Sequence, residues 1–247
     1  AVSLGYQGFE LYFQPIVRAK DESLYAAEAL LRIHDKNGNF ISPAEAIPIL
    51  EESGLIIPVG KWIIQNAFSM CTECRKYYPE FRVSINLSYV QILKSPLMME
   101  LKQIIEHSGI SCSGIIVELT ESGYLEGTPA VRSVWNDMKK LRIQIALDDF
   151  GTGYSNLMNI SNLEPDIVKL DRGFTLKALS RSYEYQLMQY VIEMVHKLNQ
   201  YVCVEGVETK EDLEKIKALG PDLIPGYYYS KPCSRDEFLK KFFDYSE

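Results

Sequence analysis

Residues 147–155 read LDDFGTGYS, and an apolar run that starts at Ile143 stops there at two adjacent acids. The run has the length and composition of a short buried strand, so Asp148 and Asp149 mark its carboxyl end. Two neighbouring carboxylates disfavour joint ionisation unless a cation or a shared proton relieves them. The Gly-Thr-Gly that follows permits a sharply bent loop whose backbone can approach a ligand. By itself the pattern is more typical of a solvated strand end entering a glycine turn. Whether the two acids belong to a functional site therefore depends on the residues at the ends of the other strands.

Outward from this strand, apolar strand patterns alternate with amphipathic helix patterns along most of the chain. The exception is the start, where strands predicted at Phe9–Val17 and Leu24–Ile33 are joined by residues 18–23 alone. This connection is too short for a crossover helix, so the two strands are predicted to form an antiparallel hairpin. Further strands are predicted at Phe81–Leu87, Gly114–Leu119, Ile143–Leu147, Asp166–Leu170, Tyr201–Val204 and Asp222–Ile224.

Helical patterns follow all of these strands except the first. Residues 42–45 read SPAE, a capping box with proline at the first helical position, which predicts a short helix that ends near Gly54. The other helices are predicted at Val59–Tyr78, Val90–His107, Pro129–Leu141, Tyr183–Leu198, Lys210–Leu219 and Arg235–Phe243.

This order of elements predicts an α/β fold, a TIM-like (β/α)8 barrel whose first strand runs antiparallel to the others. Residues 1–247 are expected to form a single domain, because no Pro-, Gly- or Ser-rich linker divides them and barrels reach this length. An open, doubly wound sheet is the alternative. The chain starts at Ala1 rather than at a methionine, which favours a domain excised from a larger multidomain signalling protein.

The composition favours a globular domain of the cytoplasm. Hydrophobic residues make up 47% of the chain, no apolar run is long enough to span a membrane, and no signal peptide is present. The net charge of −7 argues against a nucleic-acid polymer or an anionic membrane as partner, although metal ions would allow a small anionic ligand. The five scattered cysteines favour free thiols, and the Cys71-x-x-Cys74 pair lacks the second pair that a zinc site needs.

Charged and amide side chains stand inside or at the ends of most predicted strands. In a barrel, the carboxyl ends of the strands meet at one mouth, where catalytic groups cluster. A single buried acid is as often structural as functional, but this many acids in one mouth would be very costly to bury without cations. The residues expected to converge are Glu28, Asn86, Glu118, Asp148, Asp149, Lys169, Asp171 and Glu205.

The ligand types favour a hard divalent cation. The three histidines, His34, His107 and His196, do not lie at strand ends with a matching partner, and the chain has no cysteine cluster. Oxygen ligands of this kind suit Mg²⁺ or Mn²⁺ better than zinc. The Asp148-Asp149 pair suggests a carboxylate that bridges two ions, an arrangement that polarises a phosphoryl oxygen and activates water. The sequence therefore predicts hydrolysis of a phosphate ester.

Several motifs in register resemble the EAL domain of cyclic di-GMP phosphodiesterases. They extend from about Phe9 to Pro232, and their number and order make the resemblance specific. The resemblance implies a TIM-like barrel that cuts one phosphodiester of 3′,5′-cyclic di-GMP to linear pGpG, in bacterial second-messenger signalling and the regulation of biofilm formation and motility. The motifs are QPIV (14–17), EALLR (28–32), NLS (86–88), ELTE (118–121), DDFGTGYS (148–155), KLD (169–171) and EGVET (205–209).

The resemblance also implies roles for individual residues. Lys169 would position the attacking water or the scissile phosphate, and Glu205 would be the general base. Two ions of Mg²⁺ or Mn²⁺ would be held by Glu28, Asn86, Glu118, Asp148, Asp149 and Glu205. Substrate contacts are expected from Gln14, Leu30, Arg32, Pro225, Gly226 and Tyr227, with Arg32 forking to a phosphate. Supporting positions behind them are Glu121, Asp171 and Glu208.

One departure from the family pattern concerns the predicted last strand. Pro225 stands where the family has glutamine, which removes an amide side chain and a backbone donor near the site. The alternative to an active phosphodiesterase is therefore a weak or inactive cyclic di-GMP receptor that signals to a partner domain. A homodimer through the region after Asp149 is also expected from the resemblance.

Overall fold

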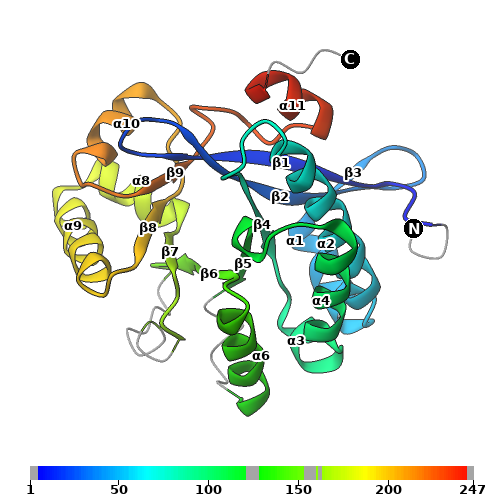
Figure 1. Ribbon diagram of the computed structural model, residues 1–247. Helices are drawn as coiled ribbons and strands as arrows, with labels where there is room; N and C mark the ends of the chain where they lie inside the picture. Colours follow the sequence, from blue (N-terminus) through cyan, green and yellow to red (C-terminus); the bar gives the residue numbers. More distant parts are fainter. Residues whose placement is uncertain (1–4, 121–127, 153–159, 161–162, 244–247) are drawn as a thin grey trace.

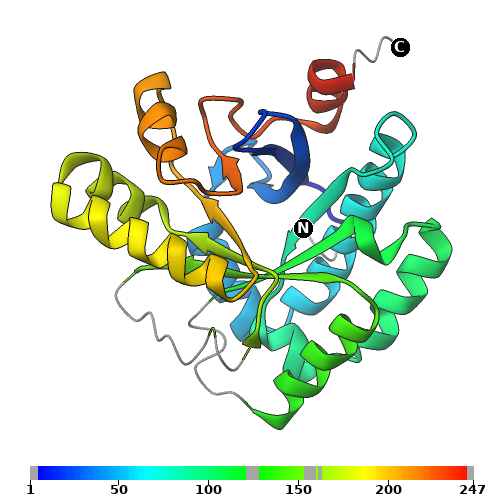
Figure 2. The same ribbon diagram turned by 60° about the vertical axis from the view of Figure 1, so that its left-hand side comes forward.

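The computed structural model describes residues 5–120, 128–152, 160 and 163–243. Within these residues, strands close into a barrel in the spatial order β1-β9-β8-β7-β6-β5-β4-β2, and β1 pairs again with β2 (Figures 1 and 2). The predicted closed barrel is confirmed and the open sheet is wrong. The barrel strands are β1 (Phe9–Arg18), β2 (Leu24–His34), β4 (Arg82–Asn86), β5 (Ile115–Thr120), β6 (Gln144–Phe150), β7 (Ile167–Leu170), β8 (Tyr201–Val204) and β9 (Leu223–Pro225).

β1 is antiparallel to both of its neighbours, β2 and β9, whereas the other barrel strands pair in parallel. The prediction of an antiparallel first strand is therefore confirmed. A short strand, β3 (Phe40–Ile41), adds to the outer side of β2. It was not predicted, because two residues carry no alternation pattern.

Helices surround the barrel (Figure 1). Interior strands such as β5 are buried on both faces, since side chains of the barrel lumen lie on one side and helices on the other. No helix among the described residues is long and apolar enough to cross a membrane. The helices are α1 (Pro43–Glu52), α2 (Ile56–Cys74), α3 (Tyr89–Lys94), α4 (Leu97–Ser108), α6 (Pro129–Lys140), α8 (Arg172–Ser180), α9 (Ser182–Lys197), α10 (Lys210–Lys217) and α11 (Arg235–Phe243).

Two helix predictions were wrong. The helix predicted at Val90–His107 is divided into α3 and α4, because Ser95 precedes Pro96 and takes an extended conformation with φ −123° and ψ 159°. A residue before proline is disfavoured in the helical region, so the helix ends there. α8 was missed between β7 and α9, although Asp171 caps it.

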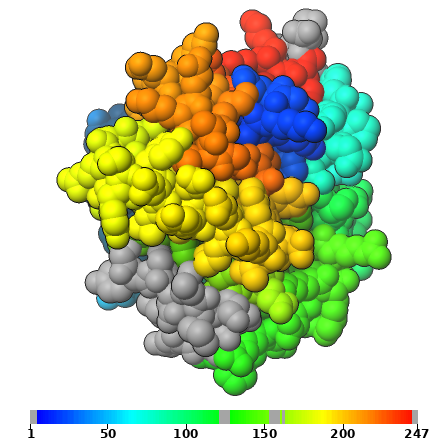
Figure 3. Space-filling view, turned by 90° about the vertical axis from the view of Figure 1, so that its left-hand side faces the viewer, coloured from blue at the N-terminus to red at the C-terminus, as the bar shows by residue number. Residues whose placement is uncertain are grey.

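Helix α11 packs against β1 on the outside of the barrel (Figure 1). The Phe238 side chain of α11 is fully buried, and its ring centroid lies 6.3 Å from that of Phe13 in β1 and 6.1 Å from that of Phe81. In Figure 3 the orange segment that includes α10 lies beside the blue segment of the first hairpin. An ion pair of 2.9 Å joins Lys217 at the end of α10 to Glu22 in the turn between β1 and β2. Both contacts join late residues to the first hairpin.

The two cysteines of the Cys-x-x-Cys pair, Cys71 and Cys74, lie on α2 and are fully buried. Burial raises the pKa of the Cys71 thiol to about 12. A thiol that is buried in apolar surroundings and protonated is chemically inert, so this pair packs as part of the core.

Candidate active site

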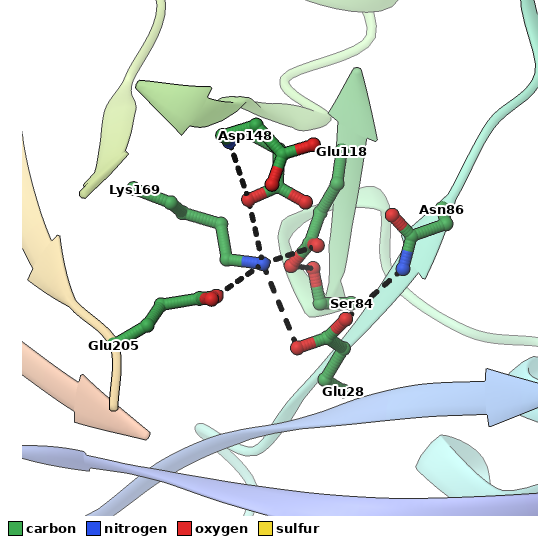
Figure 4. A network of polar contacts seen from close by, with 8 residues as sticks. Glu28, Ser84, Asn86, Glu118, Asp148, Lys169 and Glu205 are labelled. Carbon is green, nitrogen blue, oxygen red and sulfur yellow. Dashed lines mark hydrogen bonds and ion pairs between the residues drawn. The ribbon is translucent and has the colours of Figure 1, made fainter. Parts of the chain in front are cut away.

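Charged side chains from separate strands meet at the barrel mouth, around the ammonium group of Lys169 (Figure 4). The Lys169 Nζ atom lies 3.5 Å from Glu28 Oε2, 2.5 Å from Glu118 Oε2, 3.2 Å from Asp148 Oδ1 and 3.0 Å from Glu205 Oε1. These residues come from β2, β5, β6, β7 and the position after β8. The structure thus brings together four of the predicted acids, Glu28, Glu118, Asp148 and Glu205, around Lys169.

The strand register explains why these side chains share one face. Glu28 of β2 stands beside Ser84 of β4, and Asn86 of β4 stands beside Glu118 of β5. Because neighbouring residues in register point to the same side of a sheet, all four side chains face the barrel lumen. The parallel strands therefore align one polar layer near their carboxyl ends.

The cluster carries more negative than positive charge, and its central residues are shielded from water. Lys169 and Glu118 are 2% and 1% exposed, whereas the Glu205 side chain keeps 26% of its surface. Burial alone would lower the pKa of Lys169, but attraction by Asp148, Glu118, Glu205 and Glu28 outweighs it and holds that pKa well above its usual value. The ammonium group is therefore permanently charged at neutral pH.

The pKa values of two of the carboxyl groups are also raised, which disfavours their charged form. Burial, followed by repulsion from Glu28, raises the pKa of Glu118 well above its usual value against the attraction of Lys169. Burial also raises the pKa of Glu205 to about 7, again against the attraction of Lys169. A single ammonium group does not neutralise all of these acids.

Two polar neighbours fix the orientation of the acids. The buried Ser84 hydroxyl donates to Glu118 Oε1 at 2.5 Å, and the Asn86 amide nitrogen donates to Glu28 Oε1 at 3.0 Å. Ser84 was missed by the sequence analysis, although it stands two residues before Asn86 and therefore on the same face of β4. That period of two was the signal that could have found it.

Asp148 and Asp149 do not play equivalent parts. Asp148 reaches Lys169, and its Oδ1 atom also accepts a hydrogen bond of 2.9 Å from the Asp149 backbone nitrogen. Asp149 has a positive φ of 59°, and the ion pairs of Lys169 among the described residues do not include it. Partial burial and repulsion from Asp148 raise the pKa of Asp149. The second acid of the pair thus has an unneutralised carboxyl group beside the cluster.

The donor set fits a hard divalent ion in its chemistry. Oxygen ligands dominate, and burial together with repulsion from neighbouring carboxylates raises the pKa of Glu118 and of Asp149, so a bound cation would relieve this repulsion. Among the described residues, no three or more His, Cys, Asp or Glu side chains are already arranged to hold a metal ion. The carboxylates are instead drawn onto Lys169, so a metal would compete with this ammonium group for them.

A pocket of about 230 Å³ opens over the cluster. A Cβ atom at Gly226 would lie 2.4 Å from the Val207 carbonyl oxygen, so only glycine permits the chain to pass here. Arg172, which the sequence analysis did not single out, also lines this pocket. The predicted substrate-contact residues that line it are Gln14, Leu30, Pro225, Gly226 and Tyr227.

Arg32 lines a neighbouring pocket of about 470 Å³ that shares Leu30 with the first. This second pocket is also lined by Glu51, Asn86 and Ser88. The two pockets thus adjoin at Leu30 of β2.

The predicted supporting residues lie in different places. Asp171 caps α8, and its Oδ1 atom accepts from the backbone nitrogens of Gly173 at 2.8 Å and Phe174 at 3.2 Å. Glu208 forms a 2.6 Å ion pair with Arg172 at the rim of the first pocket. Glu121 and the end of the loop that follows Asp149 lie outside the described residues.

Comparisons with known proteins agree with this architecture. A family model described as EAL domain matches residues 2–232. Cyclic di-GMP phosphodiesterase PdeF of Escherichia coli (strain K12) is 30% identical over 230 residues, which cover 93% of this chain and 30% of that protein. The chain spans between 27% and 33% of the length of four similar curated relatives.

Two solved structures share the fold closely. The EAL enzyme Bd1971, bound to cAMP and cyclic-di-GMP, superposes with a TM-score of 0.92 at 30% identity, covering 98% of this chain and 66% of that one. The PaMucR phosphodiesterase in complex with c-di-GMP superposes with a TM-score of 0.89 at 26% identity, covering 96% of both chains.

Proposed function

The chain belongs to the EAL domain family, and from this premise we propose that its barrel hydrolyses one phosphodiester bond of 3′,5′-cyclic di-GMP to give linear pGpG. The observation that carries the proposal is the cluster of Glu28, Glu118, Asp148 and Glu205 around Lys169 at the barrel mouth. Similar proteins that are named cyclic di-GMP phosphodiesterases, or that were solved with this nucleotide, support the choice of substrate.

The excess of carboxylates favours a site for two Mg²⁺ or Mn²⁺ ions. Such ions, when bound, supply the positive charge that stabilises a phosphoryl oxygen and activates the attacking water. The residues that would hold them are Glu28, Asn86, Glu118, Asp148, Asp149 and Glu205.

Glu205 and Lys169 have different roles in the proposed reaction. Burial raises the pKa of Glu205 to about 7 in the metal-free chain. We assign this carboxylate the role of the general base that accepts a proton from the attacking water. Lys169 holds the acids in one place through its ion pairs, and its charge would position the attacking water or the scissile phosphate.

We expect the nucleotide to bind in the two pockets at the barrel mouth. Gln14, Leu30, Pro225, Gly226 and Tyr227 line the space above the acids, and Arg32 offers forked donors to a phosphate oxygen.

Incubation of the purified chain with cyclic di-GMP and Mn²⁺ or Mg²⁺ tests this function. Linear pGpG is expected from the natural chain and not from the Glu28→Ala variant. Absence of both binding and product in the natural chain would refute the proposal.

A cyclic di-GMP receptor is the second candidate function. Pro225, which lines the pocket above the acids, favours it because proline offers neither an amide side chain nor a backbone donor to a ligand. Tight nucleotide binding without linear product, in the presence of both metals, would support the receptor.

The natural setting of the domain is also part of the proposal. The free cysteines support a reducing, cytoplasmic compartment. We expect a homodimer through the region after Asp149, and sedimentation of the purified chain checks it: a monomer at all concentrations would contradict this expectation.

A further inference from the structure

The guanidinium group of Arg32 is held by an aromatic ring. Its Cζ atom lies 5.3 Å from the centroid of the Tyr12 ring, a distance at which a cation is attracted to the face of a tyrosine. Tyr12 of β1 pairs directly with Leu30 of β2, so Tyr12 and Arg32 are diagonal neighbours on one face of the hairpin. One Arg32 nitrogen donates to the Leu31 carbonyl oxygen at 3.0 Å.

Acids near Arg32 do not neutralise it. Glu10 is its register partner on β1 and is exposed, and Glu51 lines the same pocket but accepts a 2.6 Å hydrogen bond from the Ser88 hydroxyl. Within the described part of the chain, no salt bridge of Arg32 is found within 4 Å. The arginine is thus anchored on one side by a ring, and its donors are not occupied by an ion pair with the described residues.

An aromatic anchor has a different consequence from an acidic one. A carboxylate beside Arg32 would occupy its forked donors and cancel its charge, and it would compete with an incoming phosphate. A ring orients the guanidinium plane and leaves the edge donors available. We propose that Tyr12 is a positioning residue that holds Arg32 ready for a phosphate oxygen of the nucleotide; this inference rests on the proposed function.

Calorimetric titration with cyclic di-GMP in EDTA tests the proposal, since it measures binding without hydrolysis. The natural chain is compared with Tyr12→Leu, Tyr12→Phe, Arg32→Ala and the double variant Tyr12→Leu/Arg32→Ala. Tyr12→Leu is expected to raise Kd about three- to tenfold, and Tyr12→Phe, which keeps the ring, to restore most of the affinity. Tyr183→Leu, at a 75% exposed tyrosine of α9, is the matched control and should leave Kd unchanged.

The double variant separates positioning from general packing. If Tyr12 acts through Arg32, then Tyr12→Leu has no further effect on Kd once Arg32 is alanine. An equal loss of affinity in both backgrounds, or an unchanged Kd for Tyr12→Leu alone, would overturn the positioning role while leaving the proposed function intact. A natural chain that neither binds nor cleaves the nucleotide would overturn both.

Discussion

The balance of charge around Lys169 controls the site at the scale of single residues. Its one ammonium group contacts four carboxylates, and burial, together with repulsion between the acids, raises the pKa of two of them, Glu118 and Glu205, against the attraction of Lys169. Lys169 therefore has a structural effect as well as a chemical one. Removing it would leave buried acids facing each other.

Lys169→Met is expected to lower the free energy of unfolding by about 3–5 kcal/mol in EDTA, because buried carboxylates lose their only close cation among the described residues. Urea denaturation measures this change, and added Mn²⁺ should recover part of it. Lys139→Met is the control, since Lys139 pairs with Glu164, which is 77% exposed, and should change stability by less than about 0.5 kcal/mol. Equal effects of the two substitutions would show that the cluster does not depend on Lys169.

Pro225→Gln is expected to raise kcat about two- to tenfold. Pro225 is buried and lines the pocket over the acids, so a glutamine there adds one amide contact to the nucleotide. Steady-state kinetics with Mn²⁺ measures the gain, and Pro225→Ala, which adds no amide, should not show it. An unchanged rate in the glutamine variant would mean that this position is not limiting.

Single residues of the site were predictable from sequence where chemistry coincided with strand ends. Glu28, Glu118 and Asp148 interrupt apolar runs, so their convergence followed from the barrel rule. Ser84 and Arg172 were not found, because a serine in a strand and an arginine at a helix start are common without any function. Distances between such residues depend on register, which the sequence does not state.

Elements depend on local signals that sequence analysis detects unevenly. Proline at position 96 ended a helix that the apolar period alone predicted to continue. α8 was missed because its nine residues include glycine and threonine, which are weak helix formers. What establishes α8 is its cap, since Asp171 accepts two backbone hydrogen bonds.

Asp171→Ala should therefore lower the free energy of unfolding by about 1 kcal/mol, through loss of the cap of α8. Asp171→Asn removes the same charge but retains a capping oxygen, so it should stay within roughly a few tenths of a kcal/mol of the natural chain. Chemical denaturation of both variants makes the comparison. An equal loss in the two would assign the effect to the charge and not to the cap.

At the scale of the whole molecule, the fold depends on β1, because this strand closes the barrel. This strand joins β2 on one side and β9 on the other, and α11 covers it from outside (Figure 1). The period of the sequence predicted the closed barrel, because a crossover helix follows each parallel strand. The packing of α11 on β1 was not predictable, since its apolar side could equally have faced a partner.

Phe238→Ala is expected to reduce the free energy of unfolding by about 3–5 kcal/mol, since Phe238 fills the space between α11, Phe13 and Phe81. Thermal and chemical denaturation measure the loss. Phe40→Ala serves as a control, because Phe40 is 56% exposed and should contribute little. A small effect at Phe238 would show that α11 is not part of the stabilising core.

The pairing of Ile16 with Pro225 has a consequence for folding during synthesis on the ribosome. The barrel joins its first strand to its last, so it cannot close until β9 has been synthesised and has emerged from the ribosome. Until then, β1 and β8 each present an unpaired edge to other nascent chains. Aggregation through these two strand edges is therefore most favoured before β9 is in place.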